Sequence, residues 1–283
     1  MSRARVAVGV VVALLLGALV WEGYKAVGGD GVSVFGVRVL PRADDAAMPH
    51  VLDMLRRFGD PEMSGGEPIW LVILKACLIT LRAVAVGFGV GALVGLLLAV
   101  VMQRFRVVER GLLPYVILSQ TVPLIALAPV IAGWGGRLSI GTYPWQPWMS
   151  VATIAAYLAF FPVAVGMLRG LHSPSAIATD LMRSYAAGWW QTLVKLRLPA
   201  ATPYLFPALR LAGAAAVVGA VVGEISTGTR GGVGRLVIEY SREATADPAK
   251  VYTAMIGAAV LGLAVAAFVG VAEFLVNRWR VNV

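Results

Sequence analysis

The residues of this chain that could do acid–base, nucleophilic or metal chemistry are few and far apart. Its 283 residues include two histidines, His50 and His172, and a single cysteine, Cys77. One cysteine excludes an intrachain disulfide and any metal site built from several thiolates. A catalytic triad or a carboxylate pair needs partners within hydrogen-bond distance, and the sequence suggests no such set. We therefore expect no catalytic residue and no metal site.

Two glycine-rich strings could be mistaken for nucleotide-binding loops. The first, GFGVG (87–91), lies inside an apolar run, whereas a phosphate loop joins a strand to a helix. The second, STGTRGGVG (226–234), lacks the Gly-Lys-Ser/Thr ending of a phosphate loop and is expected to be a turn before a short helix, 235–241. The chain has no Walker A lysine, so any ATP and Mg²⁺ must be bound by a partner chain.

Composition indicates that the chain is built mainly of membrane-spanning helices. The chain is 59% hydrophobic and 14% charged, with a mean hydropathy of +0.81, which is too apolar for a soluble domain of this length. A spanning helix needs about 20 mostly apolar residues. Six stretches fit: Val6–Trp21, Ala83–Met102, Leu112–Gly133, Trp148–Leu168, Tyr204–Gly223 and Val251–Val276. We expect an all-α, polytopic membrane protein with about six transmembrane helices.

The pattern divides the chain into three regions. Residues 1–21 form the first transmembrane helix, 22–82 an external segment, and 83–283 a five-helix core. A cleaved signal peptide is the alternative for the first helix, but no small-x-small cleavage site follows it, so we favour a retained helix. Within the external segment, Pro49 opens a short amphipathic helix that could lie on the membrane surface.

Basic residues indicate the orientation of the helices. With both termini in the cytoplasm, the whole net charge of +9 falls on the inner side. The numbers of basic residues on the two sides are equal, but the short loops decide: Arg104, Arg106 and Arg110 oppose a single Arg137 in the next loop. No aromatic–basic surface accompanies the charge, so we do not expect nucleic acid as a partner.

Three glycines share one face of the second predicted span. Gly87, Gly91 and Gly95 are four residues apart, and such a stripe lets a neighbouring helix come close in lipid. Packing inside the subunit is the favoured interpretation, and a dimer interface is the alternative. Arg82, at the end of this span, is expected to extend towards the membrane surface.

Polar residues interrupt the third predicted span. Gln120 and Thr121 precede Pro123, which should bend the helix because it cannot donate a backbone hydrogen bond. Polar groups at this depth face a water-filled path or hold helices together. We take Gln120, Thr121 and Pro123 as candidates for the translocation path, and leave the structural role open.

A polar amphipathic segment, DLMRSYAAGWWQTLVKLRLP (180–199), separates two apolar runs. Pro174 is expected to open a short helix after Ser173, with an apolar stripe from Ile177 to Tyr185. Gly188 interrupts the pattern, and a second short helix, Trp189–Leu198, is expected to stop at Pro199. A helix lying across the membrane face suits a groove on a soluble partner.

This segment resembles the cytoplasmic coupling loop of binding-protein-dependent ABC importers. The family pattern runs Glu-Ala-Ala, three residues, Gly, and a dozen or so residues to Leu-Pro. Asp180 takes the acid position and Ala186 the glycine position, while Leu181-Met182 replace the paired alanines. Gly188, two residues after Ala186, could supply flexibility at the bend. Within a coupling loop at 169–203, the resemblance implies that the following residues contact the ATPase: Asp180, Arg183, Ser184, Tyr185, Ala186, Ala187, Gly188, Leu198 and Pro199.

The resemblance extends from Leu40 to Trp279, and over this range the chain is similar to the nitrate/sulfonate/taurine-type permeases. Its landmarks are Leu40-Pro41, Arg82 with Gly87, VPLIALAPVIAGWG (122–135), RSYAAGWWQ (183–191), LRLPAATPYLF (196–206), VVGE (221–224) and Gly232-Val-Gly234. The residues around Gln120–Pro123 and Arg197–Phe206 look closer to the branch that moves thiamine-precursor pyrimidines and riboflavin.

The resemblance implies a type I permease in the bacterial cytoplasmic (inner) membrane. Its partners would be ABC ATPases, a second copy or a paralogue, an external binding protein, and lipid. Glu224 would act at the outer gate or contact the binding protein, and Glu273 is expected to pair with Arg278 or Asn277. The cargo would be a thiamine-precursor pyrimidine, a riboflavin-like vitamin, or a nitrate/sulfonate-type anion. An ion-coupled secondary transporter or a channel is the alternative.

Overall fold

The computed structural model describes residues 3–28, 33–34, 37–38 and 43–281. Within them the only strands are two antiparallel pairs of two-residue strands, β1 (Ser33–Val34) with β2 (Val37–Arg38) and β3 (Ser139–Ile140) with β4 (Tyr143–Pro144). The predicted all-α class is confirmed, and the landmark Leu40-Pro41 lies outside the described residues.

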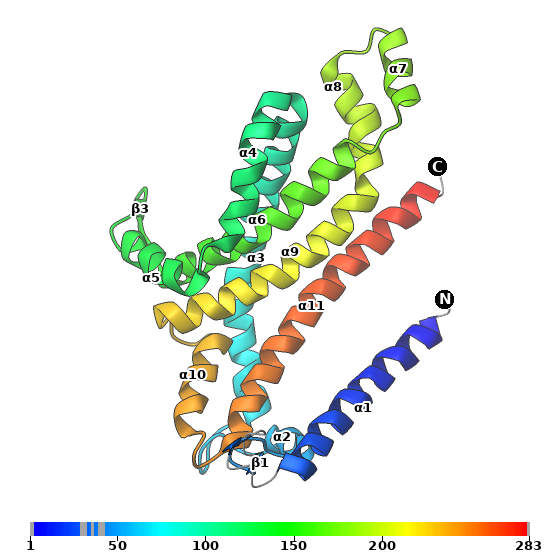
Figure 1. Ribbon diagram of the computed structural model, residues 1–283. Helices are drawn as coiled ribbons and strands as arrows, with labels where there is room; N and C mark the ends of the chain where they lie inside the picture. The colour runs from blue at the N-terminus through cyan, green and yellow to red at the C-terminus, as the bar shows by residue number, and fades with distance from the viewer. Residues whose placement is uncertain (1–2, 29–32, 35–36, 39–42, 282–283) are drawn as a thin grey trace. The chain divides into compact units, whose positions relative to one another are not determined.

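Helices make up nearly all of the rest (Figure 1). In chain order they are α1 (Arg3–Gly28), α2 (Val51–Arg57), α3 (Ile69–Arg104), α4 (Arg106–Leu118), the 3-10 turn η1 (Ser119–Thr121), α5 (Leu124–Gly135), α6 (Pro147–Leu171), α7 (Ala176–Ser184), α8 (Trp189–Thr192), the π-helical turn η2 (Leu193–Arg197), α9 (Leu198–Thr227), α10 (Val233–Glu243) and α11 (Pro248–Val281).

Five helical segments of the described chain are long and apolar enough to span a membrane. They are Val11–Gly28, Ile69–Arg104, Pro147–Leu171, Trp189–Thr227 and Pro248–Val276. The segment from α4 to α5 becomes a sixth if its two bent helices count as one span. This agrees with the expected number of about six.

The predicted third span, Leu112–Gly133, is not one helix. It breaks at η1, and the helices on either side are bent by 99°. Pro123 directly precedes α5 and has extended backbone angles (φ −62°, ψ 110°). A proline also disfavours helical angles in the residue before it, and Val122 is likewise extended. The expected bend is therefore a complete interruption.

The chain forms two compact units. The first comprises residues up to 75 together with 236–257, and the second comprises 76–235 and 258–283. Helix α3 starts at Ile69, so the boundary expected at residue 82 falls inside a continuous helix. No proline or glycine lies between residues 69 and 82 to end the helix earlier.

The first unit is held by polar contacts between distant segments. Arg57 donates to Asp247 over 2.6 Å, and the buried Lys250 pairs with Glu243 at 2.6 Å. The hydroxyl of Tyr240 donates to Glu62 over 2.8 Å, and burial together with this bond raises the pKa of Tyr240. The short helix expected after Pro49 is present as α2. These pairs join residues 57–62 to the stretch from 240 to 250.

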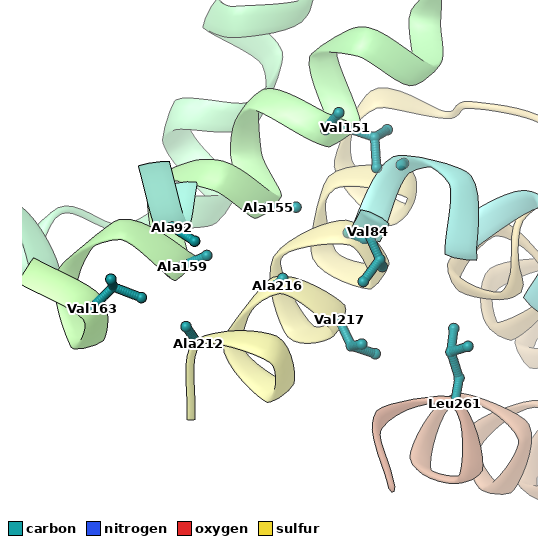
Figure 2. Close-up of a cluster of buried hydrophobic side chains, with 13 residues drawn as sticks. Val84, Ala92, Val151, Ala155, Ala159, Val163, Ala212, Ala216, Val217 and Leu261 are labelled. Atoms are coloured by element: carbon teal, nitrogen blue, oxygen red, sulfur yellow. The ribbon is translucent and has the colours of Figure 1, made fainter. Parts of the chain in front are cut away.

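The second unit is built on close packing of α3, α6 and α9. A β-carbon added to Gly87, Gly91 or Gly95 of α3 would lie 2.5–2.6 Å from backbone oxygens of α6. Gly219 of α9 approaches α6 from another side, so that Ala155 of α6 touches both neighbours. Figure 2 shows the resulting core, in which most of the labelled side chains are alanine or valine. The three glycines of α3 therefore pack inside the subunit, which excludes this face as a dimer interface.

This packing predicts different effects for two neighbouring glycines of α3. Gly91→Ala places a methyl group 2.6 Å from the Ala156 oxygen, whereas Gly89 faces open space. Both changes gain similar helix propensity, so their difference isolates the clash, which should destabilise by about 1–3 kcal/mol. In thermal unfolding of the detergent-solubilised protein, Gly91→Ala should lower the midpoint and Gly89→Ala should not. Equal midpoints for the two variants would contradict the packing.

Candidate functional site

The segment between α6 and α9 carries most of the residues expected to contact a partner. Helix α7 begins after Ser175, whose side chain accepts a hydrogen bond from the Ala178 N–H over 3.2 Å. Serine is a favoured N-cap because its oxygen satisfies a free N–H of the first turn. The start predicted at Pro174 is therefore wrong by two residues. Ser173 instead donates to the Gly170 carbonyl over 2.7 Å, at the end of α6.

Helix α7 leaves its apolar stripe uncovered. Ile177 is 83% exposed, Leu181 55% and Tyr185 76%. On the same helix Asp180 and Arg183 form a surface ion pair at 3.2 Å, and Ser184 is also exposed. Nine residues are too few to cross a bilayer, so this apolar face is not explained by lipid-spanning length. Exposed apolar stripes of this kind mark interaction surfaces.

Ala186 forms the bend after α7. Its φ is +51°, the only positive value at a non-glycine residue of the described chain. The Ala186 N–H donates to the Arg183 carbonyl over 2.8 Å, and the Ala187 N–H donates to Met182 over 3.0 Å. Together these bonds make a Schellman motif, in which glycine is the usual residue at the left-handed position. The left-handed residue of the bend is therefore Ala186 and not Gly188.

Gly188 instead begins α8. Its φ is −66° and ψ 168°, which any residue can adopt, and its N–H donates to the Gln191 side chain over 3.1 Å. Left-handed geometry at Ala186 preserves the bend where the family pattern has glycine. The strain of a β-carbon there is about 1–2 kcal/mol.

Helix α8 is anchored where α7 is free. The Trp189 indole N–H donates to the buried Gln103 of α3 over 3.3 Å, and the Arg104 guanidinium lies 5.1 Å from the ring centre. Leu193 is fully buried in an apolar cluster formed with residues of α3, α6 and α9, among them Met102, Met167 and Ala201. A displacement of α8 would therefore act on all three helices of the core.

The second short helix does not stop at Pro199. Helical structure runs from Trp189 through the π-helical turn Leu193–Arg197 into α9. Pro199 lies in the first turn of α9, where a missing N–H is tolerated. The π-helical turn directly before Pro199 is wider than a turn of α-helix. In a regular α-helix the proline ring would crowd the carbonyl one turn earlier, which lies in this wider turn. Leu198 and Pro199 thus lie at the base of a continuous helix.

Hydroxyl groups close the break between α4 and α5. Ser119 donates to the Val116 carbonyl over 2.7 Å, and Thr121 donates to Leu118 over 2.8 Å. The hydroxyl of Tyr157 on α6 donates to the Ser119 carbonyl. Of the residues predicted to line a path, Thr121 is exposed and Gln120 half-buried, with only a long 3.4 Å bond to Ser119. The geometry thus gives Thr121 a capping role and leaves Gln120 largely unengaged.

Glu224 is buried near the end of α9. It is 2% exposed; one carboxylate oxygen accepts from the Thr80 hydroxyl of α3 over 2.8 Å and the other from the Gly234 N–H over 2.8 Å. Thr80 in turn accepts from the Val233 N–H over 2.9 Å. A covered carboxylate has no surface for the predicted contact with a binding protein. The structure instead makes Glu224 a tie between α3, α9 and the start of α10, hereafter the Glu224 tie.

Glycine is required on both sides of Val233. A β-carbon on Gly232 would overlap the Glu224 carboxylate, and one on Gly234 would overlap the Val221 carbonyl. The landmarks VVGE and Gly232-Val-Gly234 are therefore parts of one contact. Sequence reasoning missed Thr80; its only signal was a hydroxyl inside an otherwise apolar run.

Glu273 also has a different partner from the one expected. It pairs with Arg210 of α9 at 2.5 Å rather than with Arg278. Gly270, one turn earlier on α11, leaves room for the guanidinium, whose nearest nitrogen would be 3.5 Å from an added β-carbon. The pair joins α9 to α11.

The comparisons with known proteins agree with this architecture. Residues 91–281 match the family described as "Binding-protein-dependent transport system inner membrane component", which is more than half of the chain. The chain belongs to this family. With five or six candidate spans, it is a multi-pass member of it.

Individual relatives share about 30% of their aligned residues with this chain. A formylaminopyrimidine transport permease protein, ThiX, of Halalkalibacterium halodurans is 34% identical over 51% of this chain and 54% of its own length. A probable ABC transporter permease protein of Haemophilus influenzae is 31% identical over 60% of this chain and 65% of its own length. A putative aliphatic sulfonates transport permease protein, SsuC, of Bacillus subtilis is 29% identical over 71% and 69%. This chain therefore spans less than two thirds of the first two relatives.

The bend at Ala186 can be tested by substitution. Ala186→Val puts a β-branched residue at positive φ and should destabilise the bend by about 1–2 kcal/mol or more, whereas Ala186→Gly should be tolerated. Amide hydrogen exchange of residues 181–187 should speed up in the valine variant. Ala187→Val, at a residue without positive φ, is the matched control, and equal exchange in both valine variants would refute the assignment.

The Glu224 tie predicts the effect of one added methyl group. Gly232→Ala displaces the carboxylate and leaves Thr80 and Gly234 without their acceptor, at about 1–3 kcal/mol for each unsatisfied group. The thermal midpoint should fall clearly below that of Gly133→Ala, whose added methyl group meets open space. If the two variants unfold at the same temperature, the tie does not support the fold.

Proposed function

We propose that this chain is the permease subunit of an ATP-driven importer, taking up a small solute delivered by an external binding protein. Membership of the family supports the class of machine. The observation that carries the proposal is the contrast between α7, with its exposed apolar stripe, and α8, which is anchored in the core. This is the arrangement needed for a partner to grip one helix and move the spans through the other.

The partners follow from what the chain lacks and exposes. Separate ABC ATPase subunits would bind ATP and Mg²⁺ and receive α7, so the chain itself is non-catalytic. A second copy or a paralogue would complete the pathway in the lipid bilayer, and an external binding protein would supply the solute. In the bacterial inner membrane both termini would then lie on the cytoplasmic side with α7 and α8, as the basic loop residues favour.

The proposed path passes the break between α4 and α5. Irregular backbone within an apolar region is stable only against protein or water, and Gln120 is a polar group there with little other engagement. Thr121 and Pro123 would shape the path by holding the break. Glu224 would act at the outer gate indirectly, because its tie fixes the segment that follows α9.

Three classes of cargo are proposed. Two relatives are named for the transport of formylaminopyrimidine and of aliphatic sulfonates. With the residue resemblances around Gln120 and Arg197, these favour a thiamine-precursor pyrimidine, a riboflavin-like vitamin, or a nitrate/sulfonate-type anion.

One observation favours the alternative of an ion-coupled secondary transporter or a channel. Broken helices are common in secondary transporters, and the α4–α5 pair is one. An ion-coupled transporter needs a carboxylate that can bind the ion. Both oxygens of Glu224, the buried candidate, already accept hydrogen bonds from protein donors. Uptake into vesicles that requires ATP inside, and not an ion gradient, would exclude this alternative.

The proposed importer function predicts that the chain loses ATPase binding when α7 is altered. The double variant Asp180→Ala, Tyr185→Ala removes an exposed aromatic anchor and its neighbouring charge, and should weaken ATPase binding at least tenfold. The measurement is co-purification from the native host in mild detergent, with the captured proteins identified by mass spectrometry.

Tyr143→Ala is the matched control, since Tyr143 is 69% exposed but lies in β4, outside α7. It should keep the ATPase. Recovery of the unaltered chain without any ATPase, in several detergents, would overturn the proposed function.

A further inference from the structure

The second unit contains a cavity of about 630 Å³ that none of the preceding assignments uses. It lies where α3, α5 and the start of α6 meet the residues that follow α9. Its walls include Arg82, Arg230, Trp145, Trp148, Thr227 and Thr229. The volume lies in the range of small-molecule sites, which combine apolar walls with a few polar groups.

Two guanidinium groups line this cavity without a carboxylate. Neither Arg82 nor Arg230 forms an ion pair within the described part of the chain. Arg82 lies 4.0 Å from the centre of the Trp148 ring, so the indole face holds its guanidinium. Stacking leaves the N–H groups at the guanidinium edge available, and this fork matches the two oxygens of a carboxylate or similar anion. A cationic ligand would be repelled by the same pair.

A second, apolar cavity adjoins the first. It has a volume of about 300 Å³ and shares Trp145 and Trp148 with the larger cavity. Its other walls include Val86, Val90 and Met149. The two indoles thus lie between a cationic compartment and an apolar one. An inorganic anion would use only the first compartment, whereas an organic anion would use both.

The walls are held in place by contacts inside the second unit. The Trp145 indole N–H donates to Ser150 over 2.8 Å, and Gly135 of α5 leaves the space that this indole occupies. The Thr227 hydroxyl bonds to the Gly223 carbonyl over 2.7 Å and to Thr229 over 2.8 Å. The Glu224 tie fixes the chain just beyond Arg230. A preformed site loses less entropy on binding.

We propose that these joined cavities bind a small organic anion with a flat or apolar body. Its charged group contacts Arg82 and Arg230, and its body lies on the indoles of Trp145 and Trp148 and reaches the apolar compartment. The inference rests on the proposed function, since it places a solute site on the permease itself. A binding assay on the purified chain needs no ATPase, so failure of this site and failure of the importer proposal can be told apart.

The test uses the full chain in nanodiscs of neutral phosphatidylcholine and isothermal titration calorimetry. Benzoate should bind saturably. Benzamide, which has the same shape without the charge, and acetate, which has the charge without the ring, should each bind at least tenfold more weakly. Arg82→Gln and Trp148→Leu should each weaken benzoate binding about tenfold. Arg137→Gln removes a nearby charge that does not line either cavity and should have no effect.

Several results would overturn the proposal. Absence of saturable benzoate binding would do so, as would equal binding of benzamide or acetate, or an equal loss in Arg137→Gln. If Arg82→Gln unfolds at the wild-type midpoint, its weaker benzoate binding comes from the lost guanidinium and not from a destabilised fold. Dihexanoylphosphatidylglycerol distinguishes the source of the anion: failure to displace benzoate supports a solute site, and displacement at similar concentration makes the cavity a lipid headgroup site instead.

Discussion

Everything described for the second unit depends on how closely α3, α6 and α9 can approach. Lipid tails are as apolar as leucine, so helices in a bilayer gain little from hiding apolar surface from one another and associate through van der Waals contact instead. Glycines on α3 and α9 let both backbones reach α6, and Ala155 touches the two of them (Figure 2). Close backbone contact also makes the group resist deformation, because no flexible side chain separates the helices.

Helix α3 connects the Glu224 tie to the anchor of α8. Thr80 near one end takes part in the Glu224 tie, and Gln103 near the other end accepts from Trp189. The two residues are roughly 35 Å apart along a straight helix. No proline interrupts α3 between them, and Gly87, Gly91 and Gly95 are covered by α6. A push on α8 would therefore reach the Glu224 tie through a single unbroken helix.

Hydropathy and spacing were enough to predict the number of candidate spans and the glycine face, because both depend on local pattern. Prolines were harder to interpret. Pro123 coincides with a break and Pro199 with a continuous helix, since the outcome depends on what else can satisfy or avoid the affected carbonyls. At η1, hydroxyls of Ser119, Thr121 and the distant Tyr157 provide those partners, and the last of these cannot be read from a local window.

Long-range polar partners were the other source of error. Glu224 and Thr80 are 144 residues apart, so Glu224 was assigned an external role instead of this partner. Glu273 meets Arg210 across 63 residues, so the nearby Arg278 or Asn277 was expected in its place. The bend at Ala186 was missed for a different reason. Left-handed geometry is usual for glycine, so flexibility was expected at Gly188, whereas the Schellman bonds hold Ala186 in that conformation. The exposed apolar stripe of α7 was predictable because it needs only helical spacing.

The break between α4 and α5 has a consequence for solvation. Helix α5 begins at Leu124 with Pro123 as its N-cap and without a side-chain acceptor, so the first N–H groups of an apolar helix point out of its end. In hydrocarbon, each such group would cost several kcal/mol, which water next to it removes. Water at this level would raise the local dielectric constant, and the free energy of moving a polar solute past it would fall accordingly. On the proposed path, the barrier that the bilayer presents to a solute would thus be lowest where the fold interrupts its own helix.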